Sequence, residues 1–274
     1  MILIVASKKD IASLNIKKQI LNNYPFKESA ESFQENPAYE AQIQGKHVRL
    51  VTLNEESVRA QELPSSFQNL RLIVFISRHS SLSGKPTLSV HTPGNLGEAE
   101  LGGLPRTVSV SPATAMREAL KTMASYKEEM SLDYEVSYEC THHGPSLNMP
   151  TMFAELGSSQ VQWNDAKAAE AVAHAAIKAI STFGESKSQT VLGIGGPHYS
   201  AKFTRVALEK ETAFSHMIPK YAISSLDAPI LRQCVDRTLE KVSHAVLDWK
   251  GIKGEDKSRV VSLLEDINLP FEKT

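Results

Sequence analysis

The stretch LRLIVFIS, residues 70–77, is a nearly continuous apolar run that ends on a serine. A run of this length and composition is typical of a strand that a parallel sheet buries on both faces. Comparable runs lie at residues 1–6 (MILIVA) and at residues 189–194 (QTVLGI). We therefore predict a largely parallel sheet that draws its strands from distant parts of the chain.

Helical patterns alternate with these strands. One helix stops at Tyr24-Pro25, a second opens at Ser111-Pro112 and reaches about residue 127, and an alanine-rich helix runs from Asn164 or Asp165 to just before Gly184. Further predicted elements are strands at residues 47–53, 133–140 and 243–247 and helices at residues 225–239 and 256–267. This alternation predicts an α/β fold, with a mixed, largely parallel sheet flanked by helices. We expect one domain over residues 1–274, with the polar stretches 27–45 and 250–258 as surface connections.

Composition limits the classes of function. Of the 274 residues 41% are hydrophobic, and 30 Lys and Arg nearly balance 31 Asp and Glu. These values are typical of a soluble globular protein, and no apolar run is long enough to span a bilayer. Without a basic excess, a nucleic acid must be held by a local patch. Cys140 and Cys234 lack CxxC spacing and favour a reducing, cytoplasmic setting, while a monomer and a homodimer stay equally open.

Histidines stand in loop-like sequence after the predicted strands. Four of them come shortly after a strand end: His79, His142, His143 and His198. His91 lies in the loop-like stretch 77–103. Because the carboxyl ends of parallel strands meet at one edge of a sheet, we expect these imidazoles to converge. Imidazole is the commonest protein ligand of zinc, and Glu155 is the nearest acidic residue after the double histidine. No spacing matches HExxH, so the metal interpretation depends on convergence.

The other histidines and the glycine turn have simpler interpretations. We interpret His47, His174 and His244 as core or surface side chains, and His216 stays open. Gly195-Gly196-Pro197 is either a tight turn or a place where a substrate reaches backbone amides. The patterns GxxxxGK[ST], GxGxxG and GxSxG do not occur, which argues against a nucleotide cradle and against the commonest serine hydrolases.

Three intervals that carry these histidines contain no acidic residue: residues 63–97, 140–154 and 186–208. They hold several cations, among them Arg78, Lys85, Lys202 and Arg205. Strands and tight loops are poor in acids in any protein. An active-site rim that accepts a polyanion produces the same pattern, and both interpretations stay open.

Several uncommon motifs follow one another along the chain. They are SRHSS (77–81), LSVHTPGN (88–95), ECTHHGP (139–145), FAELGSS (153–159) with Trp163 after it, and GIGGPHY (193–199) followed by KFT (202–204). In these motifs, their order and their spacing, nearly the whole chain resembles the archaeal and plant-type D-aminoacyl-tRNA deacylases. The resemblance implies a cytoplasmic zinc enzyme that releases D-amino acids, D-tyrosine being the usual example, from mischarged tRNA. It also implies an α/β fold like that of phosphorylases and peptidyl-tRNA hydrolases.

Given this resemblance, the residues receive hypothetical roles. A zinc ion would be held by some of His142, His143, His198 and Glu155, and would activate water and polarise the ester carbonyl. Glu155 also counts as a catalytic residue, and His79 or His91 would be the general base or complete the metal shell. The amides of Gly195 and Gly196 would stabilise the oxyanion, and the backbone of residues 195–197 would reject an L side chain. The acceptor end of the tRNA would be held by Arg78, Lys85, Lys202 and Arg205.

Two alternatives from other classes are kept. A zinc-dependent peptidase or amidohydrolase would use the same ligands on small substrates without any RNA. A non-catalytic tRNA-binding protein would bind tRNA and leave the ester intact, although aromatic residues make up only 7% of the chain. A phosphorylase would need a phosphate-binding site, and the acid-free intervals are the only sequence feature that favours one.

Overall fold

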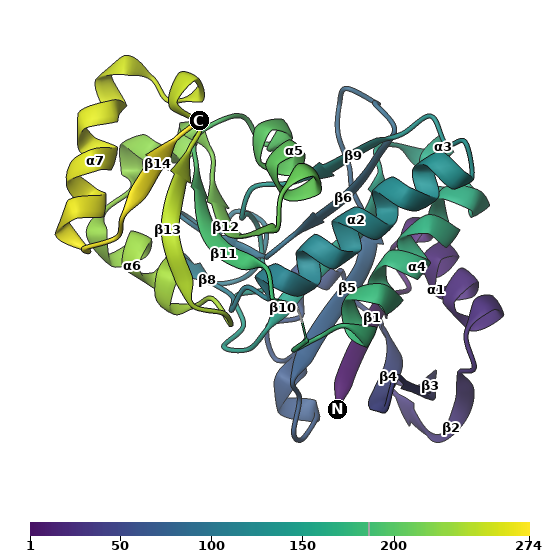
Figure 1. Ribbon diagram of the computed structural model, residues 1–274. Helices are drawn as coiled ribbons and strands as arrows, with labels where there is room; N and C mark the ends of the chain where they lie inside the picture. The colour runs from purple at the N-terminus through teal and green to yellow at the C-terminus, as the bar shows by residue number, and fades with distance from the viewer. Residues whose placement is uncertain (186) are drawn as a thin grey trace.

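The computed structural model describes residues 1–185 and 187–274. Within them lie an eight-stranded sheet, a four-stranded sheet and a two-stranded ribbon (Figure 1). The larger sheet has the order β2-β3-β4-β1-β5-β10-β6-β9. Its strands are β1 (Ile2–Ser7), β2 (Lys27–Phe33), β3 (Asn36–Ile43), β4 (Lys46–Leu53), β5 (Leu72–Arg78), β6 (Thr87–His91), β9 (Glu135–Tyr138) and β10 (Thr151–Gly157). The ribbon pairs β7 (Gly94–Asn95) with β8 (Thr107–Val108).

Three neighbouring pairs in the larger sheet are antiparallel, and the others are parallel. β1 pairs in parallel with β4 and β5, and β5 pairs in parallel with β10. The β2-β3-β4 edge is antiparallel, and so is the pair of β10 and β6. Since β6 and β9 are parallel to each other, both run opposite to β5 and β10. The predicted fold class, a mixed and largely parallel sheet flanked by helices, is confirmed.

The two faces of the larger sheet have different coverings, because alternate residues of a strand point to opposite sides. The face with Val74 and Ala154 packs against three long helices. They are α1 (Ile11–Asn23), α2 (Ala113–Glu129) and α4 (Ala166–Ser181). The other face carries Phe75 and Phe153, whose rings stack 4.7 Å apart in a smaller core. Farther along β5 and β10 this second face becomes polar, and the site is built there.

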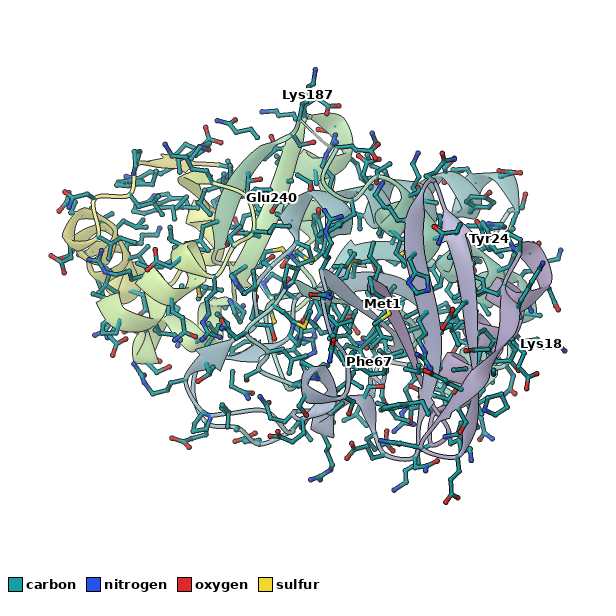
Figure 2. The ribbon with its side chains drawn as sticks, turned by 90° about the horizontal axis from the view of Figure 1, so that it is seen from below. Met1, Lys18, Tyr24, Phe67, Lys187 and Glu240 are labelled. Carbon is teal, nitrogen blue, oxygen red and sulfur yellow. The ribbon has the colours of Figure 1, made fainter. Side chains whose placement is uncertain are left out.

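The C-terminal lobe contains the four-stranded sheet, whose strands are all parallel in the order β12-β11-β13-β14. Its strands are β11 (Gln189–Ile194), β12 (Thr212–Ile218), β13 (Val242–Leu247) and β14 (Phe271–Lys273), and its helices are α5 (Ala201–Glu209), α6 (Ala228–Asp236) and α7 (Lys257–Asp266). Figure 2 shows this lobe on the side of the molecule opposite to Lys18 and Tyr24. Arg117 of α2 donates to the carbonyls of Ala207 and Lys210, which connects the lobe to the helical layer of the larger sheet. We keep one domain over residues 1–274 as a proposal that this packing supports.

Several elements differ from the prediction. Residues 27–45 are not a surface connection, because they form β2, which is largely exposed, and β3, half of whose residues are buried. Residues 151–157 were not predicted as a strand and form the central β10, buried throughout. α5, β12 and the short helix α3 (Gln160–Trp163) were also missed. Among the described residues, no helix combines the length and apolar character needed to cross a bilayer.

Candidate active site

The histidines that stand in separate motifs come together in the structure, as predicted. The ring centroids of His142 and His91 lie 4.3 Å apart, those of His142 and His143 lie 4.3 Å apart, and those of His142 and His198 lie 4.5 Å apart. His79 joins from the other side, with its ring centroid 6.4 Å from that of His198. His142 is therefore the centre of the cluster.

The expected route to this convergence is wrong in part. His91 ends β6, and His142 and His143 follow β9, two strands that run opposite to β5. Arg78, next to His79, pairs with Leu156 on β10, whereas His91 pairs with Phe153 on the same strand. The ends of β5 and β6 therefore overlap along β10 and approach each other from opposite directions. His198 arrives from β11 of the other sheet.

Alternation along β10 decides which side chains enter the site. Glu155 is in register with Ser77 of β5 and Ser89 of β6, so these three side chains share one face. The Ser77 hydroxyl donates to Glu155 Oε1 at 2.9 Å. His91 stacks on Phe153 with ring centroids 5.1 Å apart. Phe153 thus forms the apolar floor beneath His91, and Glu155 provides charge one pleat farther along.

His91, His142 and His143 form a group suited to a metal ion. Each offers a nitrogen, and these ligand atoms all lie within 4.8 Å of one another. His142 Nδ1 donates to the carbonyl of Cys140 at 2.8 Å, and His143 Nδ1 donates to the carbonyl of Gly144 at 2.7 Å. A carbonyl oxygen only accepts, so Nδ1 carries the hydrogen in both rings and Nε2 keeps its lone pair. Hydrogen bonds of this kind orient metal-binding imidazoles.

The protonation and the free nitrogens of these rings are also suited to a metal cation. Both nitrogens of the fully buried His91 lack a hydrogen-bond partner among the described residues. A buried polar atom without a partner is uncommon and needs a reason. Burial, together with the neighbouring His91, lowers the pKa of His143 to about 4, and burial beside the other imidazoles holds the pKa of His142 well below its usual range. Neutral imidazoles with free lone pairs are the form that binds zinc.

A second group combines one imidazole with two buried carboxylates. His79 Nδ1 lies 3.1 Å from Glu139 Oε1 and 3.6 Å from Glu155 Oε2. Burial lowers the pKa of His79, but the two carboxylates outweigh this effect and raise it to about 11. In return, burial raises the pKa of Glu155, and contacts with His79 and His91 outweigh it and bring it to about 2. His79 is therefore cationic and both glutamates are anionic at neutral pH.

Tyr199 and His198 extend this group toward the C-terminal lobe. The Tyr199 hydroxyl lies 2.6 Å from His79 Nε2. His198 Nε2 lies 2.8 Å from Glu139 Oε2, and its Nδ1 lies 3.3 Å from Cys140 Sγ. Burial lowers the pKa of His198, but the contacts with Cys140 and Glu139 outweigh it and raise it to about 10. Glu139 is thus shared by His79 and His198, and Tyr199 extends the group through its contact with His79.

The predicted ligand set is divided over three groups, two of which share His142. The groups are His91, His142 and His143; Cys140, His142 and His198; and His79, Glu139 and Glu155. Of the predicted ligands, His142 shares one group with His143 and another with His198, whereas Glu155 lies in the third group. His91, expected as a base or as a completing ligand, belongs with the two adjacent histidines.

Gly195 and Gly196 lie in a turn whose amides are already used. The Gly195 amide donates to the carbonyl of Ile218 at 2.8 Å, and the Gly196 amide donates to that of Gly251 at 3.4 Å. Both glycines have positive φ, 105° and 79°, and a Cβ on Gly195 would meet Ile252 and Asp248. The tight-turn interpretation therefore explains these residues, and the structure does not support an oxyanion site or a chiral wall at this turn.

Three of the four predicted tRNA-binding cations have carboxylate partners. Arg78 contacts Glu56, Lys85 contacts Glu135 and Lys202 contacts Asp248. Arg205 lies exposed on α5, three residues after Lys202. The acid-free intervals of the sequence are thus compensated by acids from elsewhere in the fold.

Sequence reasoning did not assign several residues of this centre. Glu139 is fully buried and bridges two imidazoles, and Cys140, Tyr199 and Tyr221 contact the cluster. Their only sequence signal is adjacency, because Glu139 and Cys140 precede His142 and Tyr199 follows His198 within the same motifs. His216, which the sequence left open, is buried, and burial lowers its pKa to about 4. It contacts the Thr141 hydroxyl and the carbonyl of Arg237, which indicates a structural role.

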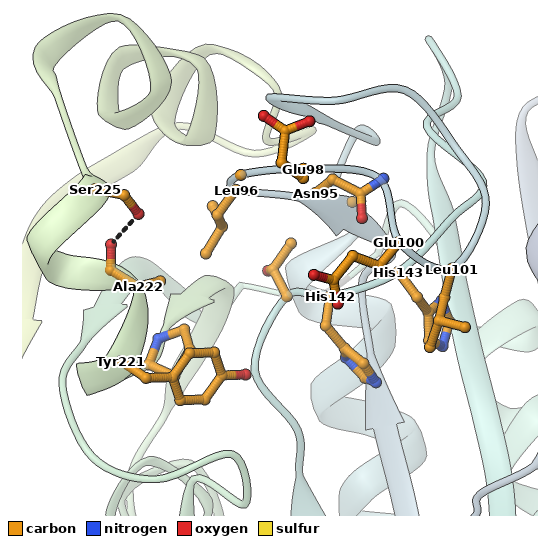
Figure 3. Close-up of a pocket in the computed structure, with 14 residues that line it drawn as sticks. Asn95, Leu96, Glu98, Glu100, Leu101, His142, His143, Tyr221, Ala222 and Ser225 are labelled. Atoms are coloured by element: carbon orange, nitrogen blue, oxygen red, sulfur yellow. Dashed lines mark hydrogen bonds between the residues drawn. The ribbon is translucent and has the colours of Figure 1, made fainter.

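A cavity of about 310 Å³ opens beside the histidines (Figure 3). Its walls are residues 94–101 on one side and Pro219 with the 3-10 segment Lys220–Ser225 on the other, and His142 and His143 form its inner end. Figure 3 shows the Tyr221 ring turned toward His142 across the base of this space. The cluster is thus reachable by a ligand.

Imidazoles, carboxylates and a cavity lie together at the junction of two sheets of an α/β fold, an arrangement suited to hydrolytic chemistry. Residues 66–272 match the family model described as D-aminoacyl-tRNA deacylase. The chain belongs to that family.

Relatives extend the match to nearly the full length. The D-aminoacyl-tRNA deacylase of Thermococcus onnurineus is 36% identical over 274 residues, with 98% of each chain covered. That of Pyrococcus abyssi is 37% identical over 277 residues, again with 98% of each chain covered. A crystal structure described as a conserved protein of unknown function superposes with a TM-score of 0.89 at 28% identity, over 100% of this chain and 95% of that one.

Proposed function

We propose that this chain hydrolyses the ester bond between a D-amino acid and its tRNA, releasing the free amino acid and the tRNA. The observation that carries the proposal is the three-histidine group, whose ligand nitrogens lie within 4.8 Å of one another beside an open cavity. Family membership supports the substrate class. The free, buried cysteines fit an enzyme that works in the reducing cytoplasm.

We propose that His91, His142 and His143 hold a zinc ion. Three histidines with a fourth position left open are a usual ligand set of catalytic zinc. When bound, such an ion supplies an activated water near neutral pH and polarises a carbonyl oxygen. Glu155 Oε2 lies 3.7 Å from His91 Nε2, so a carboxylate stands directly beside this group.

In this proposal Glu155 accepts a proton, and His79 together with Tyr199 donates one. Glu155 is ionised at neutral pH and accepts the proton of the attacking water. His79, expected as a general base, is already protonated and serves as a donor. It donates through Nε2 to the Tyr199 oxygen, which leaves the Tyr199 proton free to point toward substrate. The ribose oxygen that leaves when the ester bond breaks takes up a proton from this side.

The tRNA would lie over the rim formed by Arg78, Lys85, Lys202 and Arg205. Arg205, exposed on α5 next to the Tyr199 side of the centre, is the cation with the most accessible position. Phosphate contacts from such residues position the nucleic acid without reading its sequence. We retain this assignment as a proposal for all four residues.

Release of tyrosine from D-tyrosyl-tRNA and L-tyrosyl-tRNA tests the function directly. We expect the zinc-loaded protein to release D-tyrosine and to leave the L-ester at its spontaneous rate. A chelator should stop release and added zinc should restore it. Cleavage of peptides or N-acyl amino acids without RNA would instead favour a small-molecule hydrolase, and tRNA binding without release would favour a non-catalytic protein.

Tyr199→Phe removes only the hydroxyl that contacts His79. We expect kcat for D-tyrosyl-tRNA to fall about 100-fold, the lower range for loss of a positioned proton donor, with little change in KM. Tyr126→Phe is the matched control, because Tyr126 stacks on His174 in the helical layer. Steady-state kinetics of the three proteins check this, and an unchanged kcat for Tyr199→Phe would exclude the hydroxyl from the reaction.

A further inference from the structure

We propose that the cavity in Figure 3 is the aminoacyl subsite, in which Glu98 and Glu100 bind the α-ammonium group and an apolar wall holds the amino acid side chain. This rests on the proposed function, because it assigns one part of the substrate to one part of the site. The assignment follows from the position, the lining and the charge of the cavity.

The cavity lies next to the three-histidine group. His142 and His143 line the cavity and also belong to the three-histidine group, so a carbonyl held at that group lies at the inner end of the cavity. Only two groups flank the ester carbonyl and its oxygen, the aminoacyl group and the terminal ribose. One of them therefore occupies the cavity. Its volume of about 310 Å³ is at the lower end of the range for small-ligand pockets, about 300–1,000 Å³.

The lining is suited to an amino acid side chain. Leu96 and Leu101 stand on one wall, and Ala222 and Tyr221 stand on the other. Leu101 and Tyr221 are 62% and 59% exposed, unusually high for large apolar side chains beside a buried centre. Exposed apolar groups that face one another across a concave site are typical of ligand pockets. A planar, apolar side chain such as that of tyrosine fits between them.

Charge decides between the two candidate groups. Glu98 and Glu100 line the cavity, are exposed, and form no ion pair among residues 1–185 and 187–274. Among the described residues that line the cavity there is no lysine or arginine. Two uncompensated carboxylates repel the phosphates of a nucleotide, whereas the α-ammonium is the one cation near the ester bond. The carboxylates therefore select the aminoacyl group, and the terminal nucleotide lies outside the cavity.

This arrangement also gives a basis for reading chirality. The α-carbon of the substrate would be held by its carbonyl at His142 and His143, by its ammonium at Glu98 and Glu100, and by its side chain at the apolar wall. Three fixed substituents on one carbon distinguish the two enantiomers, because exchange of any two breaks at least two contacts. The loop 94–101 and the segment Lys220–Ser225 take the place of the glycine turn as the chiral wall.

The test compares two substrates that differ in one charge. D-Tyrosyl-tRNA and N-acetyl-D-tyrosyl-tRNA are assayed at about pH 6.5, where an α-amino group of ordinary pKa about 7.7–8.0 is protonated. We expect acetylation to lower kcat/KM of the unmodified enzyme about 10-fold to 100-fold, the usual range for a charge-assisted contact. The double variant Glu98→Gln, Glu100→Gln should lose the same factor on D-tyrosyl-tRNA and nothing on the acetylated substrate. Glu265→Gln, an exposed glutamate on α7, is the matched control.

The outcomes separate this inference from the proposed function. If the unmodified enzyme releases D-tyrosine but the double variant keeps the full preference for the free amino group, the subsite assignment is wrong and the deacylase function stands. If the double variant loses the same factor in kcat/KM on both substrates, the assignment is also wrong, because the loss then does not depend on the charge of the amino group. Absence of any release by the unmodified, zinc-loaded enzyme refutes the function itself.

Discussion

Replacing His142 with alanine is expected to lower deacylation of D-tyrosyl-tRNA by more than about 100-fold and to abolish binding of the zinc ion that we propose for the three-histidine group. Loss of an outer partner of a metal ligand alone typically costs about 10- to 100-fold, so loss of a ligand exceeds that range. His142 is the most sensitive position because it belongs to two of the three groups, with His91 and His143 and with Cys140 and His198. Single-turnover kinetics and metal analysis of the purified protein measure the two effects.

His47→Ala is the control for His142→Ala. His47 is exposed on β4 and its ring lies 3.3 Å from Glu40, away from the cluster, so its removal should change neither turnover nor zinc content. Circular dichroism should show both variants folded, because His142 is partly exposed at the surface of the cavity. Near-normal turnover in folded, zinc-free His142→Ala would remove the three-histidine group from the mechanism.

Replacing Glu139 with glutamine is expected to lower the free energy of unfolding by about 3–5 kcal/mol, the range for breaking a buried ion pair at one partner. Glu139 is fully buried and stands between His79 and His198. Burial raises the pKa of this carboxyl, but His198 and His79 outweigh it and hold the pKa well below its usual range. The amide of glutamine keeps the shape and removes the charge, so two cationic imidazoles lose their shared partner. Urea unfolding of the metal-free proteins measures the difference.

The pH dependence of this loss has a defined sign. The pKa of His79 is raised from 6.5 to about 11, so its stabilising contribution is complete below about pH 6.5 and declines as the pH rises toward 11. The pKa of Glu155 is lowered from 4.5 to about 2, so its contribution is complete above about pH 4.5 and declines as the pH falls toward 2. In Glu139→Gln the decline above pH 6.5 should flatten. Glu31→Gln, which breaks the exposed pair with Arg49, should change stability by no more than about 1 kcal/mol; a Glu139→Gln effect equally small would contradict the paired state.

The strands that could be predicted from the sequence are the ones whose side chains are buried on both faces of a sheet. The runs at residues 1–6, 70–77 and 189–194 became β1, β5 and β11, because strands buried on both faces are apolar along their whole length. β2 carries mainly exposed polar side chains, so its membership in the sheet depends on backbone pairing that no composition reveals. β10 was hidden for another reason, because Glu155 interrupts its apolar run to serve the site.

The sequence alone identified which imidazoles matter. His79, His91, His142, His143 and His198 were singled out by their place in loop-like motifs, and all of them lie in the cluster. The family resemblance was likewise readable from the motifs, and the family is confirmed. These properties are local, since a motif and its position after a strand are contained in a few consecutive residues.

Only the tertiary structure decided how the imidazoles are grouped and charged. Strand direction placed His91 with His142 and His143, and register placed Glu155 and Glu139 beside His79, whose pKa they raise. Pairing also occupied the amides of Gly195 and Gly196 and most of the predicted tRNA-binding cations. Protonation and hydrogen bonding depend on distances of a few ångströms between residues far apart in the chain. Those distances exist only once both sheets have formed.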